Sequence, residues 1–205
     1  RFSGHGYVAV SAGYRLAPEA PWPAQIEDVR AALALTRELA SEYGFDPSRV
    51  AAMGSSAGGH LVAMLATIGA GDEPGLGSLP PETDTRPNAV VCYCPVTTIA
   101  DPDLQSGRLS AAYGKLMGDK ADRTPRAYVA ASPLHRVTGT EPPFLFVHGD
   151  ADETVPLAQS EAMSGALKSA GVLADLEVLP GVAHGFGYGV NTAPQRRSLA
   201  AIDSF

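Results

Sequence analysis

A Gly-x-Ser-x-Gly stretch, Gly54–Gly58, places Ser56 between two runs of apolar residues. The run before it is short and rich in small side chains, and the run after it has apolar residues at helical spacing as far as Ile68. This order predicts a strand, a sharp turn and a helix, with the serine at the apex of the turn. Gly54 and Gly58 provide the small neighbours that such a strained turn requires.

A helix that begins just after Ser56 would place backbone N–H groups and a partial positive charge beside the serine. The N–H of Ala57 is the expected first donor of an oxyanion hole, because it directly follows the nucleophile. A serine hydroxyl is a weak nucleophile at neutral pH and needs a general base, which in turn is oriented by an acid. The sequence must therefore supply both groups.

The base is expected after the acid, because a serine at such a turn is followed along the chain first by the acid and then by the histidine. The five histidines are His5, His60, His135, His148 and His184. Only His184 follows an acidic residue at the end of a predicted strand that itself follows Ser56. His184 lies in a loop just past the last predicted strand, where catalytic residues of parallel sheets gather.

Three acidic residues follow the predicted strand 144–147, namely Asp150, Asp152 and Glu153. We select Asp152, because the Asp-x-x-Val-Pro segment Asp152–Pro156 places it at the turn into the next helix. Asp150 is expected to brace the turn by accepting hydrogen bonds from backbone N–H groups. The residues alone separate these alternatives only modestly.

Two other residues could compete for a chemical role. His60 lies four residues after Ser56 on the predicted helix, but a serine at the apex of such a turn points away from its helix. His60 is therefore expected to pack beneath the turn. Cys94 has no nearby base in the sequence and is expected to be a buried thiol. Cys92 and Cys94 are two residues apart in a predicted strand, so we expect them on one face without a disulfide bond.

The composition excludes several classes of function. The 205 residues carry a formal net charge of −7, which argues against nucleic acid as a partner. No apolar run approaches the roughly 20 residues that span a bilayer. Two cysteines provide neither a disulfide framework nor a four-ligand zinc site. The cellular compartment is not indicated by the sequence.

Strands are expected to alternate with helices along the chain. This alternation predicts an α/β fold with a mostly parallel central sheet and helices on both faces. The segment 97–134 is expected to be irregular and partly helical, and segments in this position can cover a site or merely add to the surface. Besides the strand and helix around Ser56, the predicted strands are 7–12, 89–93, 144–147 and 173–179, and the predicted helices are 25–43, 160–170 and 194–205.

Four stretches of the chain resemble the α/β-hydrolase superfamily, and the resemblance covers nearly the whole chain. The branches that it resembles most are the hormone-sensitive-lipase-like esterases and the carboxylesterases that include acetylxylan and feruloyl esterases. The resemblance implies Ser56 as nucleophile, Asp152 as acid and His184 as base. The stretches are Tyr14–Glu19, Gly54–Leu61, His148–Pro156 and His184–Phe186.

The N-terminus departs from the pattern of this superfamily. Its members carry a His-Gly-Gly-type motif shortly upstream of the strand that corresponds to 7–12, and this motif supplies the remaining oxyanion-hole donors. The segment Gly4–Gly6 is not this motif, because it directly abuts that strand. We therefore expect residues 1–205 to form a single α/β-hydrolase catalytic domain without the early N-terminal strands, with the remaining donors missing upstream of Arg1.

The expected function is that of a serine carboxylesterase acting through an acyl-enzyme. The resemblance implies short-chain esters as substrates, carbohydrate-linked esters among them, and neither a metal nor an organic cofactor. The expected partner is a small-molecule ester, and the oligomeric state is not indicated. One alternative is a serine peptidase or amidase of the same fold, similar to the prolyl-peptidase or arylformamidase branches. The other is a non-catalytic binding protein with a hydrolase fold.

Overall fold

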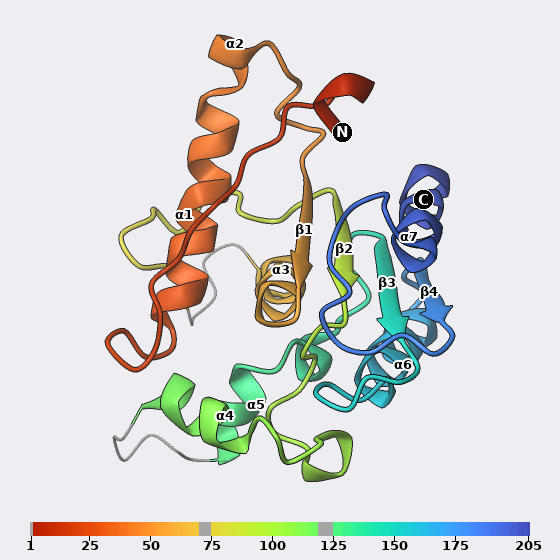
Figure 1. Cartoon of the computed structure of the whole chain (residues 1–205). Helices are drawn as coiled ribbons and strands as arrows, with labels where there is room; N and C mark the ends of the chain where they lie inside the picture. The colour runs from red at the N-terminus through yellow and green to blue at the C-terminus, as the bar shows by residue number, and fades with distance from the viewer. Residues whose placement is uncertain (1, 70–74, 119–124) are drawn as a thin grey trace.

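Within the residues that the computed structural model describes, four strands form one open sheet in which every pair of neighbours runs parallel (Figure 1). The structure describes residues 2–69, 75–118 and 125–205. The strands lie in chain order, and the connections between them pass through helices, as parallel pairing requires. They are β1 (Ala51–Ser55), β2 (Ala89–Tyr93), β3 (Phe144–Gly149) and β4 (Ala174–Leu179).

The helices that pack on the sheet begin and end close to where the sequence predicts them, and those elsewhere differ more from the prediction. The region predicted to be partly helical contains α4 and α5, which lie beyond the carboxyl ends of the strands (Figure 1). The α-helices are α1 (Ala24–Glu38), α2 (Ala40–Tyr43), α3 (Ala57–Thr67), α4 (Ser110–Met117), α5 (Pro125–Ala130), α6 (Ala158–Ser169) and α7 (Ala193–Ser204). The short 3-10 helices are η1 (Phe2–His5), η2 (Pro102–Leu104) and η3 (Pro133–Arg136).

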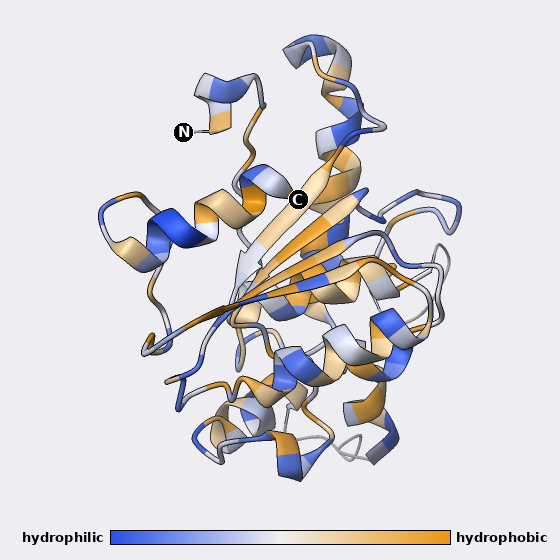
Figure 2. Ribbon diagram, turned by 90° about the vertical axis from the view of Figure 1, so that its right-hand side faces the viewer, coloured by the Kyte–Doolittle hydropathy of each residue, from blue (hydrophilic) through white to orange (hydrophobic). Residues whose placement is uncertain are grey.

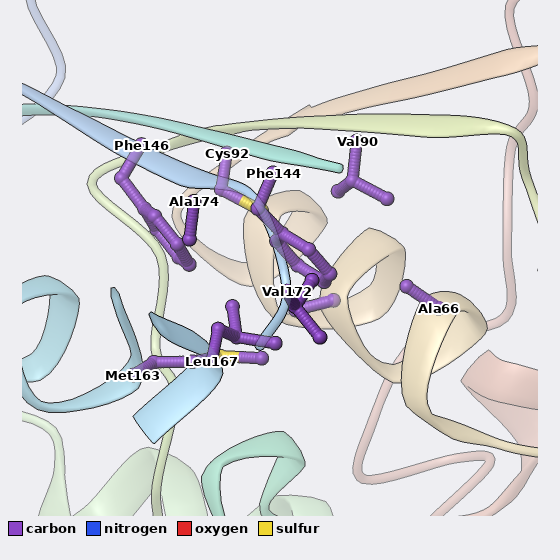
Figure 3. Packing of buried hydrophobic residues seen from close by; sticks show 10 residues of the cluster. Ala66, Val90, Cys92, Phe144, Phe146, Met163, Leu167, Val172 and Ala174 are labelled. Atoms are coloured by element: carbon purple, nitrogen blue, oxygen red, sulfur yellow. The ribbon is translucent and has the colours of Figure 1, made fainter. Parts of the chain in front are cut away.

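The core lies on both faces of the sheet, which explains why the strands are apolar along most of their length (Figure 2). On one face, Phe144 and Phe146 stack at 5.5 Å between ring centroids and pack against Met163 and Leu167 of α6 and small side chains of α3 (Figure 3). On the other face, α7 covers a second cluster that includes Tyr93. The predicted parallel sheet with helices on both faces is confirmed.

The long helix predicted at 25–43 is two helices. The break falls at Leu39, and Gly44 ends α2 in the left-handed conformation with φ of 70°. Arg30 of α1 is fully buried although it is charged, and its Nε donates to Thr85 Oγ1 at 2.9 Å. The loop that carries Thr85 therefore lies against this face of α1.

The strand predicted at 7–12 is absent from the structure. The segment is extended and exposed, with 65% of Tyr7 and 61% of Val10 accessible to solvent. Within the described ranges, residues 8–12 form no backbone hydrogen bonds to a strand, and β1 is an edge of the sheet. The segment has the apolar residues of a strand, but a strand also needs a hydrogen-bonded neighbour, and the segment has none in the described ranges.

The two cysteines lie on opposite faces of the sheet, contrary to the prediction. Cys92 belongs to the cluster under α3 and α6, whereas Cys94 belongs to the cluster on the α7 side. The alternation fails because β2 ends at Tyr93 and Cys94 has a positive φ of 36°. Both thiols are free and buried, as expected.

Two further sequence predictions can be compared only over part of the chain. The segment predicted at 97–134 includes residues 119–124, which lie outside the described ranges. In the three ranges that the structure describes, no helix is long and apolar enough to cross a membrane.

Candidate active site

The strand–turn–helix arrangement predicted around Ser56 is confirmed. Ser56 lies between β1 and α3 with φ of 54° and ψ of −115°, a left-handed backbone that a residue with a side chain rarely adopts. Its N–H donates to the Tyr93 carbonyl at 2.9 Å, and its carbonyl accepts from the N–H of His60 at 2.9 Å. These two bonds hold the strained turn between the neighbouring strand and the first turn of α3.

The two glycines of the motif have different surroundings. A Cβ on Gly54 would lie 2.2 Å from the carbonyl oxygen of Gly58, so the strand and the helix can meet only if residue 54 lacks a side chain. A Cβ on Gly58 would meet nothing within 4 Å in the described part of the chain. The expected requirement for a small residue therefore holds for Gly54, and the structure does not support it for Gly58.

This difference gives a matched pair of stability predictions. Gly54→Ala should destabilise the fold by about 3 kcal/mol, because the clash is with backbone. Gly58→Ala should be neutral or stabilising by up to about 1 kcal/mol, because alanine favours helix. Urea unfolding of the two variants beside the parent measures both. Equal stabilities for the two variants would contradict this account of the turn.

Three loops at the carboxyl ends of the strands bring the predicted site residues together. Ser56 follows β1, Asp152 follows β3 and His184 follows β4. The Oγ of Ser56 lies 2.9 Å from Nε2 of His184, and Nδ1 of His184 lies 2.6 Å from Oδ2 of Asp152. Because a carboxylate only accepts, Nδ1 carries the proton and Nε2 is left to accept from the serine. The geometry allows a proton to pass from Ser56 to His184.

The structure also separates the three acidic candidates. Asp152 is the one in contact with His184, and only 1% of its side chain is exposed. Asp150 accepts from the N–H of Gly181 at 2.6 Å, which is the bracing role expected for it. Glu153 points to solvent, with 75% of its side chain exposed, and pairs with Arg108. Asp152 is therefore the acid that the fold places beside the imidazole.

Gly149, which the sequence analysis did not single out, lies where the loop that carries Asp152 meets the loop that carries His184. A Cβ on Gly149 would lie 2.0 Å from the carbonyl oxygen of Val182. The same carbonyl accepts from the N–H of Ala151 at 3.1 Å. The close approach of the two loops sets the distance between Asp152 and His184. Its signal in the sequence is a glycine two residues after the predicted strand 144–147.

His60 does not take part in this arrangement. It is buried, and its Nε2–H donates to the Ala131 carbonyl at 2.8 Å while its ring lies 5.7 Å from that of Trp22. Burial lowers the pKa of His60, so its ring is neutral. The expectation that His60 packs as part of the core beneath the turn agrees with these contacts.

The only group in the described ranges that could hold a metal ion is formed by Cys94, Asp152 and His184. One ligand atom from each lies within 4.8 Å of the others. Burial raises the pKa of the Cys94 thiol, which disfavours the thiolate that metal binding requires. Asp152 and His184 are already hydrogen-bonded to each other, so a metal would have to displace that bond. The donors fit the proton relay better than a metal centre.

A cavity of about 360 Å³ opens beside the serine. Ser56 and Ala57 form part of its wall, so the N–H expected to bind an oxyanion lies at the same opening. Side chains of α4 line the other side, which agrees with the expectation that this region covers a site. Most of the lining is apolar, and it includes Leu16, Trp22, Leu61, Val96, Ile99, Leu109 and Leu116.

Comparisons with known proteins agree with this geometry. Residues 1–167 match the BD-FAE family. Esterase LipC of Mycobacterium tuberculosis is 35% identical over 206 residues, which is 98% of this chain and 51% of LipC. The chain spans about half the length of the curated relatives LipC and LipQ, 51% and 47% respectively.

Solved structures extend the likeness to the fold. The apo form of Thermogutta terrifontis esterase 2 is 30% identical with a TM-score of 0.80, covering 99% of this chain and 72% of that one. An acetyl ester-xyloside bifunctional hydrolase from Caldicellulosiruptor lactoaceticus is 26% identical with a TM-score of 0.79. The match covers 94% of this chain and 68% of that one. The chain has an open parallel sheet with helices on both faces, and these solved structures share its fold. Together the two findings identify the α/β-hydrolase fold.

Proposed function

The chain belongs to the BD-FAE family of α/β-hydrolase-fold proteins, and on this premise we propose that it hydrolyses carboxylic esters through Ser56, His184 and Asp152. The observation that carries the proposal is the unbroken hydrogen-bonded series from Ser56 Oγ through the imidazole to the Asp152 carboxylate, at 2.9 and 2.6 Å. The names of LipC and of the Thermogutta enzyme as esterases support the ester bond as the target.

In the proposed reaction, Ser56 Oγ attacks the ester carbonyl while Nε2 of His184 takes the hydroxyl proton. The N–H of Ala57 binds the oxyanion that forms on the carbonyl oxygen. The intermediate collapses, the C–O bond to the alcohol breaks, and His184 gives its proton to the departing oxygen. A water molecule activated by His184 then cleaves the acyl-serine ester, releasing the acid. Asp152 keeps the proton of the resting imidazole on Nδ1 throughout.

The test uses a fluorophosphonate probe and a panel of matched substrates. The probe should label the protein at one serine, because it reacts with activated serine hydroxyls without requiring a substrate to be guessed. p-Nitrophenyl esters should be hydrolysed much faster than the anilides of the same acids. Cleavage of anilides in preference to esters would favour the amidase alternative. A folded protein that neither labels nor hydrolyses would count against the proposal.

The substrate is proposed to carry an apolar group that enters the cavity beside Ser56. A volume of about 360 Å³ lies within the range of small-molecule sites and has room for more than an acetyl group. Burial of each methylene contributes about 0.8 kcal/mol, so a group that fills the apolar wall gains affinity with length. The proposed range therefore extends from short acyl chains to medium-chain or aromatic groups.

Narrowing the cavity should shift this preference toward short chains. Ala112 is an exposed residue of α4 that lines the cavity, and the neighbouring Ala111 is exposed but does not line it. Ala112→Trp should lower kcat/KM for p-nitrophenyl octanoate by about tenfold while leaving the acetate ester nearly unchanged. Ala111→Trp is the control and should leave both substrates unchanged. Equal losses on the two esters in Ala112→Trp would contradict the assignment of the cavity.

A further inference from the structure

We propose that His148 is a positioning residue. Its Nε2–H donates the fourth of the hydrogen bonds that the Asp152 carboxylate accepts, and this bond fixes the carboxylate against His184. The inference rests on the proposed function, in which Asp152 orients the imidazole of His184. His148 lies on β3, four residues before Asp152, and its side chain is fully buried. The mechanism described above gives this buried titratable group no role.

The contacts of His148 determine which ring nitrogen carries the proton. Nε2 lies 2.9 Å from the Val155 carbonyl oxygen and 3.3 Å from Oδ2 of Asp152. Both oxygens can only accept, so Nε2 must be the protonated nitrogen. Nδ1 lies 2.8 Å from Oγ of Ser160, which therefore donates its hydroxyl proton to Nδ1. The Nε2–H donates to the Val155 carbonyl, and in the proposed arrangement the Asp152 carboxylate at 3.3 Å shares this N–H.

The ring is neutral in this position. Burial lowers the pKa of His148, which favours the neutral ring, and in that form Nδ1 accepts from the Ser160 hydroxyl. The titratable groups that face Asp152 are His148 from β3, His184 from the loop after β4 and the Cys94 thiol after β2. Burial raises the pKa of the Cys94 thiol, so it stays protonated. His148 therefore acts on Asp152 as a neutral donor.

With His148 included, every acceptor site of Asp152 has a partner. A carboxylate has about four lone-pair sites. Oδ1 accepts from the N–H groups of Thr154 and Val155, each at 2.9 Å, and Oδ2 accepts from His184 at 2.6 Å. The Nε2–H of His148 is the fourth donor, on the same oxygen as His184. Two backbone bonds fix Oδ1, and His148 fixes the oxygen that His184 uses.

Two substitutions separate this role from simple packing. His148→Leu fills the space without a donor, and His148→Gln retains an N–H at a comparable reach. His148→Leu should lower kcat by about tenfold to hundredfold with little change in KM. The acidic limb of its kcat/KM profile, which follows protonation of the base His184, should move to higher pH, because a carboxylate that has lost a donor attracts the protonated imidazole more strongly. His148→Gln should restore most of both values.

Circular dichroism and thermal unfolding establish which variants are folded before their kinetics are compared. A folded His148→Leu with unchanged kcat and an unchanged pH profile would overturn the proposal. Equal losses in His148→Leu and His148→Gln, with the acidic limb where it is in the parent, would assign His148 to packing alone and overturn it too.

Nuclear magnetic resonance of the parent protein tests the inference without turnover and without a variant. With ¹⁵N-labelled histidine, His148 should be observed as the neutral Nε2–H tautomer at neutral pH, because burial lowers its pKa. A charged His148, or the Nδ1–H tautomer, would overturn the proposal even if the protein hydrolyses esters. The expected tautomer in a protein that hydrolyses no ester would support the arrangement around Asp152 and count against the proposed function instead.

Discussion

Replacing Ser56 with alanine is expected to lower kcat for ester hydrolysis by about a millionfold and to abolish fluorophosphonate labelling. The loss should approach the whole contribution of the catalytic group, because neither His184 nor Asp152 can form the acyl intermediate. The fold should remain intact for two reasons. The contact identified for the Ser56 hydroxyl is its hydrogen bond with His184, and the turn is held by hydrogen bonds of the Ser56 backbone. Steady-state kinetics and mass spectrometry of the labelled protein provide the two measurements.

Ser55 provides the matched control, since it is the adjacent serine of the same motif. Its hydroxyl lies 3.7 Å from the Cys94 sulfur and is not part of the series that leads to Asp152. Ser55→Ala should still react with the probe, and the labelled peptide should carry the adduct on Ser56. Substantial hydrolysis by purified Ser56→Ala would mean that another group attacks the ester.

The parts of the site that could be predicted from the sequence are those encoded within a few consecutive residues. The turn at Ser56 depends on a strand, the glycine at position 54 and a helix that are contiguous in the chain. The loops that carry Asp152 and His184 each follow a buried strand, and parallel strands bring their carboxyl ends to one edge of the sheet. Local pattern and sheet topology together therefore placed three distant residues at one site.

The features that escaped prediction depend on contacts between distant segments. The apolar segment 7–12 has the composition of a strand, but no neighbouring strand pairs with it in the described ranges. Arg30 is a charged residue of α1 that is fully buried, and its Nε donates to Thr85, 55 residues further along the chain. The two cysteines separate because a positive φ at Cys94 interrupts the alternation of β2. None of these contacts has a signal in the local sequence.

The role of His148 illustrates the same limit within the candidate site. Its position before a glycine and an acidic residue places it near Asp152 in the sequence, but the pattern does not say which way the ring points. Only the structure brings the carbonyl of Val155, the hydroxyl of Ser160 and the carboxylate of Asp152 around that ring. The environment of an acid is a three-dimensional property, whereas its position after a strand is a local one.

The same environment predicts that Asp152→Asn will lower kcat by about ten thousandfold, as expected when the imidazole is held in the wrong tautomer. The Thr154 and Val155 N–H groups fix Oδ1 of the asparagine as the acceptor, which turns its NH₂ group toward His184. That donor favours the imidazole tautomer in which Nδ1 accepts and Nε2 carries the proton. Nε2 then has no lone pair with which to take the proton of Ser56.

Asp150→Asn and Glu153→Gln are the controls that distinguish this effect from a general loss of negative charge in the loop. Asp150 has a carboxylate oxygen bonded to the Gly181 N–H, which an asparagine oxygen can replace, and Glu153 is exposed and paired with Arg108. Both variants should retain kcat within a few-fold of the parent, because neither side chain contacts His184. Kinetics of the three variants under one set of conditions make the comparison. A loss in Asp150→Asn as large as that in Asp152→Asn would be inconsistent with Asp152 alone orienting His184, because the only property that the two substitutions share is the removal of one charge from the same loop.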